Sequence, residues 1–196
     1  TDVVEHRHAR RVRLGREAQV EAWIVHQQQR IGLLRRQQRD HLVEHAAVFT
    51  VEESSKVDRD IPGAHTKNLF LKDAGGQFWL VTVPADMRVD LKALPQAIGC
   101  KRVSFANADD MLQVIGVTPG AVTPLASIHD RSGLVTIVLD ETLVRSGRIN
   151  VHPLRNTATI GLSPSDLIRL LRHWGHDPVI ATIPAKDATL DIEGFR

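Results

Sequence analysis

The sequence predicts a mixed α/β fold made of one domain, and three observations support this prediction. Short runs rich in β-branched and aromatic residues alternate with helix-like runs from about residue 44 onward. The 196 residues are enough for one domain with a full hydrophobic core. No internal repeat or low-complexity tract interrupts the pattern. We therefore predict a domain over residues 41–184, preceded by an Arg-rich segment at 1–40 and followed by a loosely held tail at 185–196.

The positive charge of the chain is concentrated at its front. Residues 1–40 carry nine Arg and five acidic residues, a net charge of +4, whereas residues 41–196 carry 16 Lys and Arg against 18 acidic residues, a net charge of −2. A helix is predicted over about residues 16–38, because its apolar residues follow a 3.6-residue stripe. These residues are Val20, Trp23, Ile24, Ile31 and Leu34. The arginines beside the stripe are either a solvated surface or a contact for RNA phosphates, and the sequence leaves both open.

The composition argues against several classes of protein. No apolar run approaches the ~20 residues of a membrane span, and the front has no apolar signal-peptide core, so we expect a cytoplasmic protein without membrane contact. Tyr is absent and aromatic residues make up 4%, which argues against an open sheet that stacks single-stranded RNA. The single cysteine, Cys100, excludes an internal disulfide and is expected to be a small buried or half-buried thiol.

One short pattern resembles a metal site. Residues 41–45 read H-L-V-E-H, which matches the H-x-x-E-H motif of inverted zinc peptidases, and this motif requires a helix. A strand-like run at residues 48–51 follows at once, and no distant acidic ligand is signalled. We therefore predict no metal site at His41 and His45, and no cofactor.

A β-hairpin is the first strong element after the charged front. Pro62 and Gly63 signal a turn, residues 65–68 form a polar cluster, and the apolar residues 69–71 begin the first arm. Residues 73–76 signal the turn into a second arm at 77–83, whose content of β-branched and aromatic residues is typical of a buried strand. Further strands are predicted at 102–105, at 134–139, in a segment that ends at residue 160, and at 179–183.

Three helices are predicted from their end signals. Asp90, Asn107 and Ser163 are expected to be the N-terminal caps. The glycines that end the helices are Gly99, Gly116 and Gly175. Pro95 lies inside the first of these helices and is expected to shorten it.

Three polar segments, 63–68, 116–124 and 150–157, are separated by core-forming runs. This pattern is typical of a pocket built from loops on a rigid sheet. Two Gly and two Pro restrict the backbone of residues 116–124, so this loop can direct its N–H groups at a ligand.

The same three segments resemble the signature motifs of the YbaK/prolyl-tRNA-synthetase-associated domain family. They read G-A-H-T-K-N-L-F-L-K-D at 63–73, G-V-T-P-G-A-V-T-P at 116–124 and N-V-H-P-L-R-N-T-A-T at 150–159. The similarity runs in order from about residue 44 to residue 183, and the branch it most resembles is that of the free-standing alanyl-tRNA(Pro) deacylases. The resemblance implies a curved, barrel-like mixed β-sheet flanked by helices. It also implies hydrolysis of the ester that joins a wrong amino acid to tRNA.

The resemblance also implies the site residues. Those expected to be catalytic are Lys67, Asn68, Gly120 and His152. Those expected to bind the substrate are His65, Thr66, Arg102, Ala121, Val122, Thr123, Pro124 and Val151. The chain departs from the family where residues 44–47 read E-H-A-A instead of the usual E-H-P-P. It departs again at Val151, where relatives commonly carry Phe, and this change predicts a wider amino-acid pocket.

The chemistry of such a site needs few groups. An aminoacyl ester is already activated, so the enzyme must position water and stabilise the charge that grows on the carbonyl oxygen. Lys67 supplies a compact cation, and N–H groups of the 120–124 loop can bind the ester carbonyl. His152 is either a general base or a hydrogen-bonded wall of the pocket. No Ser or Cys nucleophile is signalled.

The leading hypothesis is a trans-editing aminoacyl-tRNA deacylase that removes alanine from the acceptor end of tRNA(Pro). Prolyl-tRNA synthetase is a second candidate partner. One alternative keeps the enzyme and changes the substrate to a tRNA mischarged with Cys or Ser. Another is a non-catalytic adaptor that binds tRNA or a synthetase through residues 1–40.

Overall fold

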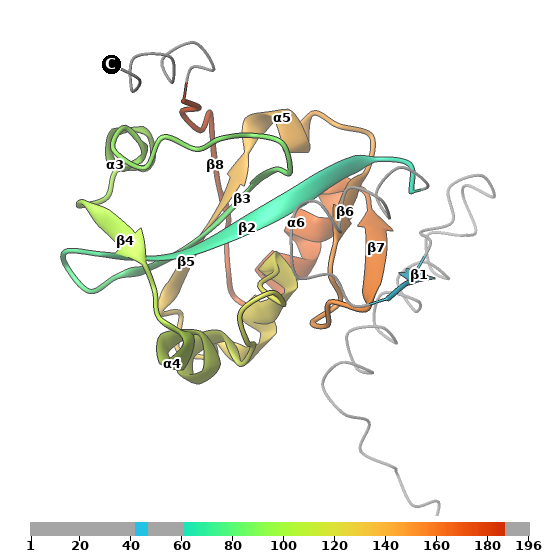
Figure 1. Cartoon of the computed structure of the whole chain (residues 1–196), viewed down its shortest axis with the longest axis horizontal. Coiled ribbons are helices and arrows are strands. Elements are labelled where there is room, and N and C mark those ends of the chain that lie inside the picture. The colour runs from blue at the N-terminus through green and yellow to red at the C-terminus, as the bar shows by residue number, and fades with distance from the viewer. Residues whose placement is uncertain (1–41, 47–60, 187–196) are drawn as a thin grey trace, which may run out of the picture. The chain divides into compact units, whose positions relative to one another are not determined.

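The structure, a computed structural model, describes residues 42–46 and 61–186 (Figure 1). These residues belong to one compact unit of the chain. The predicted Arg-rich helix, the strand at 48–51 and most of the predicted tail lie outside the described residues. Ala185 and Lys186, the first two residues of that tail, bond to the chain near residue 88, because Ala185 forms a β-bridge with Val89 and the Lys186 N–H donates to the Arg88 carbonyl at 2.7 Å.

One mixed sheet of eight strands forms the centre of the fold. In chain order the strands are β1 (Leu42–Glu44), β2 (Ala64–Asp73), β3 (Phe78–Pro84), β4 (Val103–Phe105), β5 (Val135–Asp140), β6 (Ile149–Val151), β7 (Ala158–Leu162) and β8 (Val179–Ala181). Their spatial order is β1-β7-β6-β2-β3-β5-β8, and β4 pairs with β2 beside this path. The pairs β2–β6, β3–β5 and β5–β8 are parallel, and the other pairs are antiparallel. The mixed α/β fold is therefore confirmed, but the sheet is open, with β1 and β8 at its ends, and does not close into a barrel.

The predicted hairpin is confirmed as β2 and β3, which pair from Thr66 with Pro84 to Lys72 with Phe78. The Asp73 carboxylate holds the turn between them, because it accepts the N–H of Gly75 at 2.7 Å and that of Gln77 at 3.1 Å. The polar cluster at 65–68 does not precede the strand, as predicted, but forms part of β2 itself. Polar side chains are accepted there because the first half of β2 is only half-buried.

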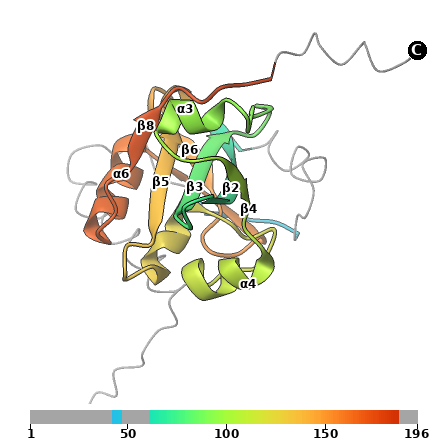
Figure 2. The same ribbon diagram turned by 90° about the vertical axis from the view of Figure 1, so that its left-hand side faces the viewer.

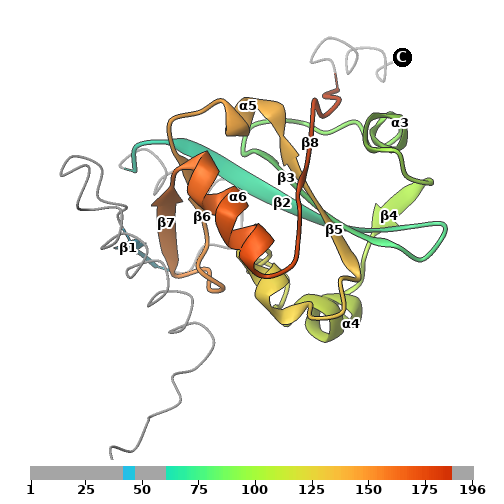
Figure 3. The same ribbon diagram turned by 180° about the vertical axis from the view of Figure 1, so that it is seen from behind.

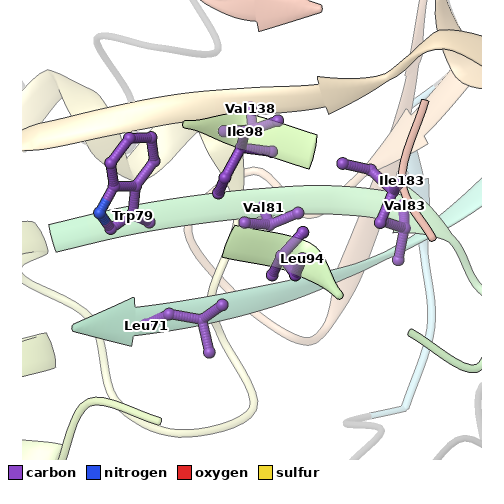
Figure 4. Packing of buried hydrophobic residues seen from close by; sticks show 8 residues of the cluster. All are labelled: Leu71, Trp79, Val81, Val83, Leu94, Ile98, Val138 and Ile183. Carbon is purple, nitrogen blue, oxygen red and sulfur yellow. The ribbon is translucent and has the colours of Figure 1, made fainter. Parts of the chain in front are cut away.

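The helices are short and cover both faces of the sheet. They are α3 (Leu94–Ile98), α4 (Ala108–Asp110), the π-helix η1 (Met111–Ile115), the 3-10 helix η2 (Pro124–His129), α5 (Glu141–Val144) and α6 (Pro164–His173). Figure 3, the view from behind, shows α6 crossing in front of the sheet, and Figure 2 shows the layers from the side. On the opposite face, Leu94 and Ile98 of α3 pack in one apolar cluster with Leu71, Val81 and Val83 (Figure 4).

The predicted helix caps are largely confirmed. The Asn107 side chain accepts the N–H of Asp110 at 2.7 Å, and the Ser163 hydroxyl accepts that of Asp166 at 3.1 Å. Asp90 instead caps the turn before α3, and the helix begins only at Leu94. Pro95 explains the delay, because proline is accepted in the first turn of a helix and not in its interior.

Two strands, β1 and β6, were not predicted. Ile149–Val151 forms β6, although the sequence suggests a polar segment that begins at residue 150. All three residues of β6 are buried, and the Asn150 side chain is 2% exposed. Among residues 42–46 and 61–186, no helix has the length and apolar composition needed to cross a bilayer.

Candidate active site

The sheet is split along one edge of β2. On one side β2 pairs with β3 along almost its whole length. On the other side it pairs with β6 only at Ala64 and His65, and pairing resumes with β4 at Leu71. The Phe70 carbonyl already accepts the N–H of Ala106, just beyond β4, at 3.0 Å. We call residues 66–69, where no described strand pairs with this edge, the β2 gap. Lys67 and Asn68 lie in this gap.

Lys67 extends from the face of the sheet that α3 covers, because alternate residues of β2 share a face and Leu71 packs against α3. Its side chain is half-buried. Beyond β3, Met87 and Val89 pack on the apolar core, and Asp86 and Arg88, which alternate with them along the chain, are exposed. Burial lowers the pKa of the Lys67 ammonium, the Asp86 carboxylate raises it, and the Arg88 guanidinium lowers it further.

We expect Lys67 to titrate at a lower pH in the native protein than in the unfolded chain. Between these two pKa values the unfolded chain binds more protons, so the free energy of unfolding should rise with pH across that window. NMR titration of the Lys67 side-chain signals in native and in urea-unfolded protein measures both pKa values. Identical values in the two states would contradict the burial of this ammonium group.

Asn68 extends to the opposite face from Lys67 and bonds to the polar loop at 116–124. Its side-chain Nδ2 donates to the Val122 carbonyl at 2.9 Å, and its Oδ1 accepts the hydroxyl of Thr82 at 2.8 Å. Lys67 and Asn68 are neighbours in the sequence, and both are expected to be catalytic. The strand alternation instead gives them separate surroundings, one near Asp86 and Arg88 and the other against the loop.

The loop at 116–124 is fixed at both ends. At its start, Gly116 lies against the ring of His129, whose Nδ1 donates to the Ile115 carbonyl at 2.8 Å. At its end, Thr123 caps η2 and is fully buried. Between these ends Gly120 has a φ of 91°, a conformation that side chains disfavour.

The N–H groups of this loop differ in their bonding. That of Ala121 donates to the Thr118 carbonyl at 3.0 Å, and Pro124 has no N–H group. In the second half of the loop, residues 120–124, the N–H groups of Gly120, Val122 and Thr123 have no hydrogen-bond partner among the described residues. These three groups are therefore the candidates for binding an oxyanion.

His152 follows the end of β6. The parallel register pairs His65 with Asn150, so Lys67 and His152 each come two residues after the last pair of the two strands. The Nδ1 of His152 donates to the Ala158 carbonyl at 2.9 Å, so in the neutral ring the lone pair is on Nε2. The ring of His45 lies with its centroid 6.2 Å from that of His152, and the His45 Nε2 is 3.0 Å from the Thr159 hydroxyl oxygen.

The other predicted site residues are more dispersed. His65 and Thr66 fasten β2, because the His65 Nε2 donates to the Ile61 carbonyl and the Thr66 hydroxyl donates to the Asn150 carbonyl, both at 2.8 Å. Val151 is the buried last residue of β6, the strand between β2 and β7, and directly precedes His152. Arg102 lies beside the hairpin turn at the far end of β2, where its carbonyl accepts the N–H of Ala74 at 2.9 Å. The structure therefore places Lys67 and Asn68 in the β2 gap, bonds the loop to Asn68, and puts His152 just beyond the end of β6, whereas Arg102 lies at the far end of β2.

Some residues at the site carry no local sequence signal. Thr82 and His45 approach Asn68 and His152 only through strand pairing. Asp86 and Arg88 approach Lys67 because the chain continues beyond β3 along the same face. His45 belongs to the H-x-x-E-H pattern, but Leu42–Glu44 is a strand and not the helix that a zinc peptidase needs.

Mixed α/β domains of known structure share the fold of this chain. One of these, proposed to be a trans-editing enzyme for prolyl tRNA synthetase, superposes with a TM-score of 0.62 at 19% identity, over 88% of this chain and 99% of that one. The chain itself belongs to the aminoacyl-tRNA editing domain family, whose model matches residues 45–170. The resemblance found in the three motifs is thereby confirmed, as is the class of enzyme, an aminoacyl-tRNA deacylase.

Curated relatives are similar over most of their length. Prolyl-tRNA synthetase associated domain-containing protein 1 of Bos taurus is 42% identical over 147 residues, which cover 72% of this chain and 85% of that protein. Prolyl-tRNA editing protein ProX of Acetoanaerobium sticklandii is 39% identical over 136 residues, which cover 69% of this chain and 83% of that protein.

Proposed function

We propose that this protein hydrolyses alanyl-tRNA(Pro) as a free-standing editing enzyme. The observation that carries the proposal is the β2 gap, which exposes a half-buried lysine and bonds through Asn68 to a loop whose residues 120–124 include three N–H groups without a described partner, while a histidine held by the Ala158 carbonyl follows the neighbouring strand β6. The names of the relatives, which refer to prolyl-tRNA editing and to prolyl-tRNA synthetase, support tRNA(Pro) as the carrier.

The proposed reaction is the attack of water on the ester carbonyl. The N–H groups of Gly120, Val122 and Thr123 stabilise the oxyanion that forms, without any side chain. The Lys67 ammonium neutralises the terminal phosphate or the growing negative charge. His152, with its lone pair on Nε2, accepts the proton from water and gives it to the ribose oxygen, which leaves as its bond to the carbonyl carbon breaks. Every group in this scheme comes from the chain itself.

Alanine is the proposed amino acid because of a size argument. A synthetase site that accepts proline cannot strongly reject a smaller side chain, since each missing methylene is worth about 1–3 kcal/mol. A second site that admits only small side chains removes the error. We further propose that the Arg-rich residues 1–40 gather tRNA, that prolyl-tRNA synthetase is a partner, and that the protein acts in the cytoplasm.

Deacylation of a panel of charged tRNAs tests the choice of substrate. We expect alanine to be released from tRNA(Pro) at least tenfold faster than cysteine or serine, and correctly charged prolyl-tRNA(Pro) to be left intact. The rates are measured with radiolabelled amino acids under identical conditions. If cysteine or serine is released faster than alanine, the substrate is the tRNA charged with that amino acid. If the protein binds the tRNAs without hydrolysing them, the adaptor alternative is supported.

A further inference from the structure

We propose that Thr82 is a positioning residue for the deacylation reaction, in that its hydroxyl fixes the Asn68 side chain and, through it, the backbone of the 120–124 loop. This inference rests on the proposed function of that loop as the binder of the ester carbonyl. We call the chain of hydrogen bonds from Thr82 through Asn68 to the Val122 carbonyl the Asn68 bridge.

The chemistry of the three groups allows only one arrangement of this bridge. The Val122 carbonyl can only accept, so the end of the amide that faces it must be Nδ2. The Oδ1 end then faces the Thr82 hydroxyl, which lies opposite on β3, and this hydroxyl is the donor that Oδ1 uses. Thr82 is fully buried, so water does not reach the hydroxyl from outside. Without the hydroxyl, Oδ1 would lose this donor in a half-buried position, and the amide would turn toward another donor and release the loop.

The bridge joins the sheet to the part of the loop that carries the unpaired N–H groups. Val122 lies between Gly120 and Thr123, and only its carbonyl is bonded to the Asn68 side chain. Ala121 is bonded within the loop, to Thr118, and Thr123 is held at the start of η2. Among the described residues, Asn68 thus provides the side-chain hydrogen bond from β2 to residues 120–122. Oxyanion donors must hold their positions closely, so losing this bond should reduce the rate more than the binding of tRNA.

The test compares three threonine variants in the full-length protein. Thr82→Val keeps the shape of the side chain and removes the hydroxyl, and Thr82→Ser keeps the hydroxyl. Thr136→Val makes the same change at a half-buried residue of β5 that pairs with Trp79 and not with Thr82 or Asn68. With alanyl-tRNA(Pro) we expect Thr82→Val to lower kcat by about 10- to 100-fold and to change KM by less than about twofold. Thr82→Ser and Thr136→Val should stay within about threefold of the wild-type kcat.

A second measurement does not depend on the substrate. In ¹H–¹⁵N NMR spectra, Thr82→Val should shift the N–H signals of Gly120, Val122 and Thr123 and speed the exchange of the Asn68 side-chain amide protons. Thr82→Ser should restore both. If the wild-type protein hydrolyses no aminoacyl-tRNA, the proposed function fails, but these signals still decide whether the bridge exists.

Three results would overturn the role of Thr82. They are an unchanged kcat in Thr82→Val, an equal loss of kcat in the Val and Ser variants, and loop signals that do not move. If Thr82→Val does not fold, Thr82→Cys replaces it, because the thiol keeps the volume and is a weaker donor. The cysteine variant should then have a kcat that is lower than that of the wild type by less than about tenfold. A kcat equal to that of the wild type would count against the proposal.

Discussion

Lys67→Ala will lower kcat/KM for alanyl-tRNA(Pro) by about 10³-fold and will leave the fold intact. The reason is the position of the ammonium group, which is the cation placed in the β2 gap and half-buried there. Burial lowers the pKa of Lys67, which means that the charged form is slightly disfavoured in the native protein. Removing the side chain should therefore change the free energy of unfolding by less than about 1 kcal/mol. Single-turnover deacylation and thermal unfolding measure the two effects.

Lys72→Ala is the matched control for this variant. Lys72 lies on the same strand, its Nζ is 3.4 Å from an Asp110 carboxylate oxygen, and it lies 4.8 Å from the centroid of the Phe78 ring. Its loss should cost less than about 1 kcal/mol of stability and leave the rate unchanged. Equal rates for Lys67→Ala and wild type would remove Lys67 from the site.

Gly120→Ala is expected to have the second-largest effect. The backbone of Gly120 has a φ of 91°, so an alanine there would either be strained or move the loop. Because Gly120 donates one of the three candidate oxyanion N–H groups, we expect kcat to fall by about 10²-fold. The free energy of unfolding should fall by about 1–2 kcal/mol. Both quantities are measured on the purified variant.

Gly133→Ala separates strain from catalysis. Gly133 has a φ of 67°, and a Cβ built on it has no atom within 4 Å, so alanine there is strained but not crowded. Its loss of stability should be similar to that of Gly120→Ala, with full activity. If the two variants lose activity equally, the effect of Gly120 is a general loss of stability and not a property of the loop.

Local signals in the sequence were enough for much of the fold. The hairpin of β2 and β3 follows from a turn signal between two apolar runs, and the caps at Asn107 and Ser163 follow from side chains that bond to a nearby N–H. The polar loop at 116–124 also has a local signature, because its glycines and prolines restrict the backbone. The π-helix that leads into this loop has no such signature, because residues 111–115 read as an ordinary α-helix.

The arrangement of the site depended on contacts that no local pattern shows. The β2 gap exists because β6 and β4, far apart in sequence, pair with different ends of one strand. Lys67 and Asn68 are neighbours in the sequence, but the alternation of β2 turns their side chains to opposite faces. The partners of Asn68 come from β3 and from the loop, and therefore required the register of the strands. The motif named the candidate residues, and the tertiary pairing determined what each one contacts.

Single-turnover hydrolysis of alanyl-tRNA(Pro), with enzyme in excess, tests the central claim most directly. We expect the wild-type protein to release alanine with a single exponential time course, at least 10³-fold faster than Lys67→Ala, while prolyl-tRNA(Pro) decays only at the rate seen without enzyme. This result would establish editing of tRNA(Pro) at the β2 gap. Release of alanine by the wild-type protein at the uncatalysed rate, under conditions in which the protein binds the tRNA, would contradict it.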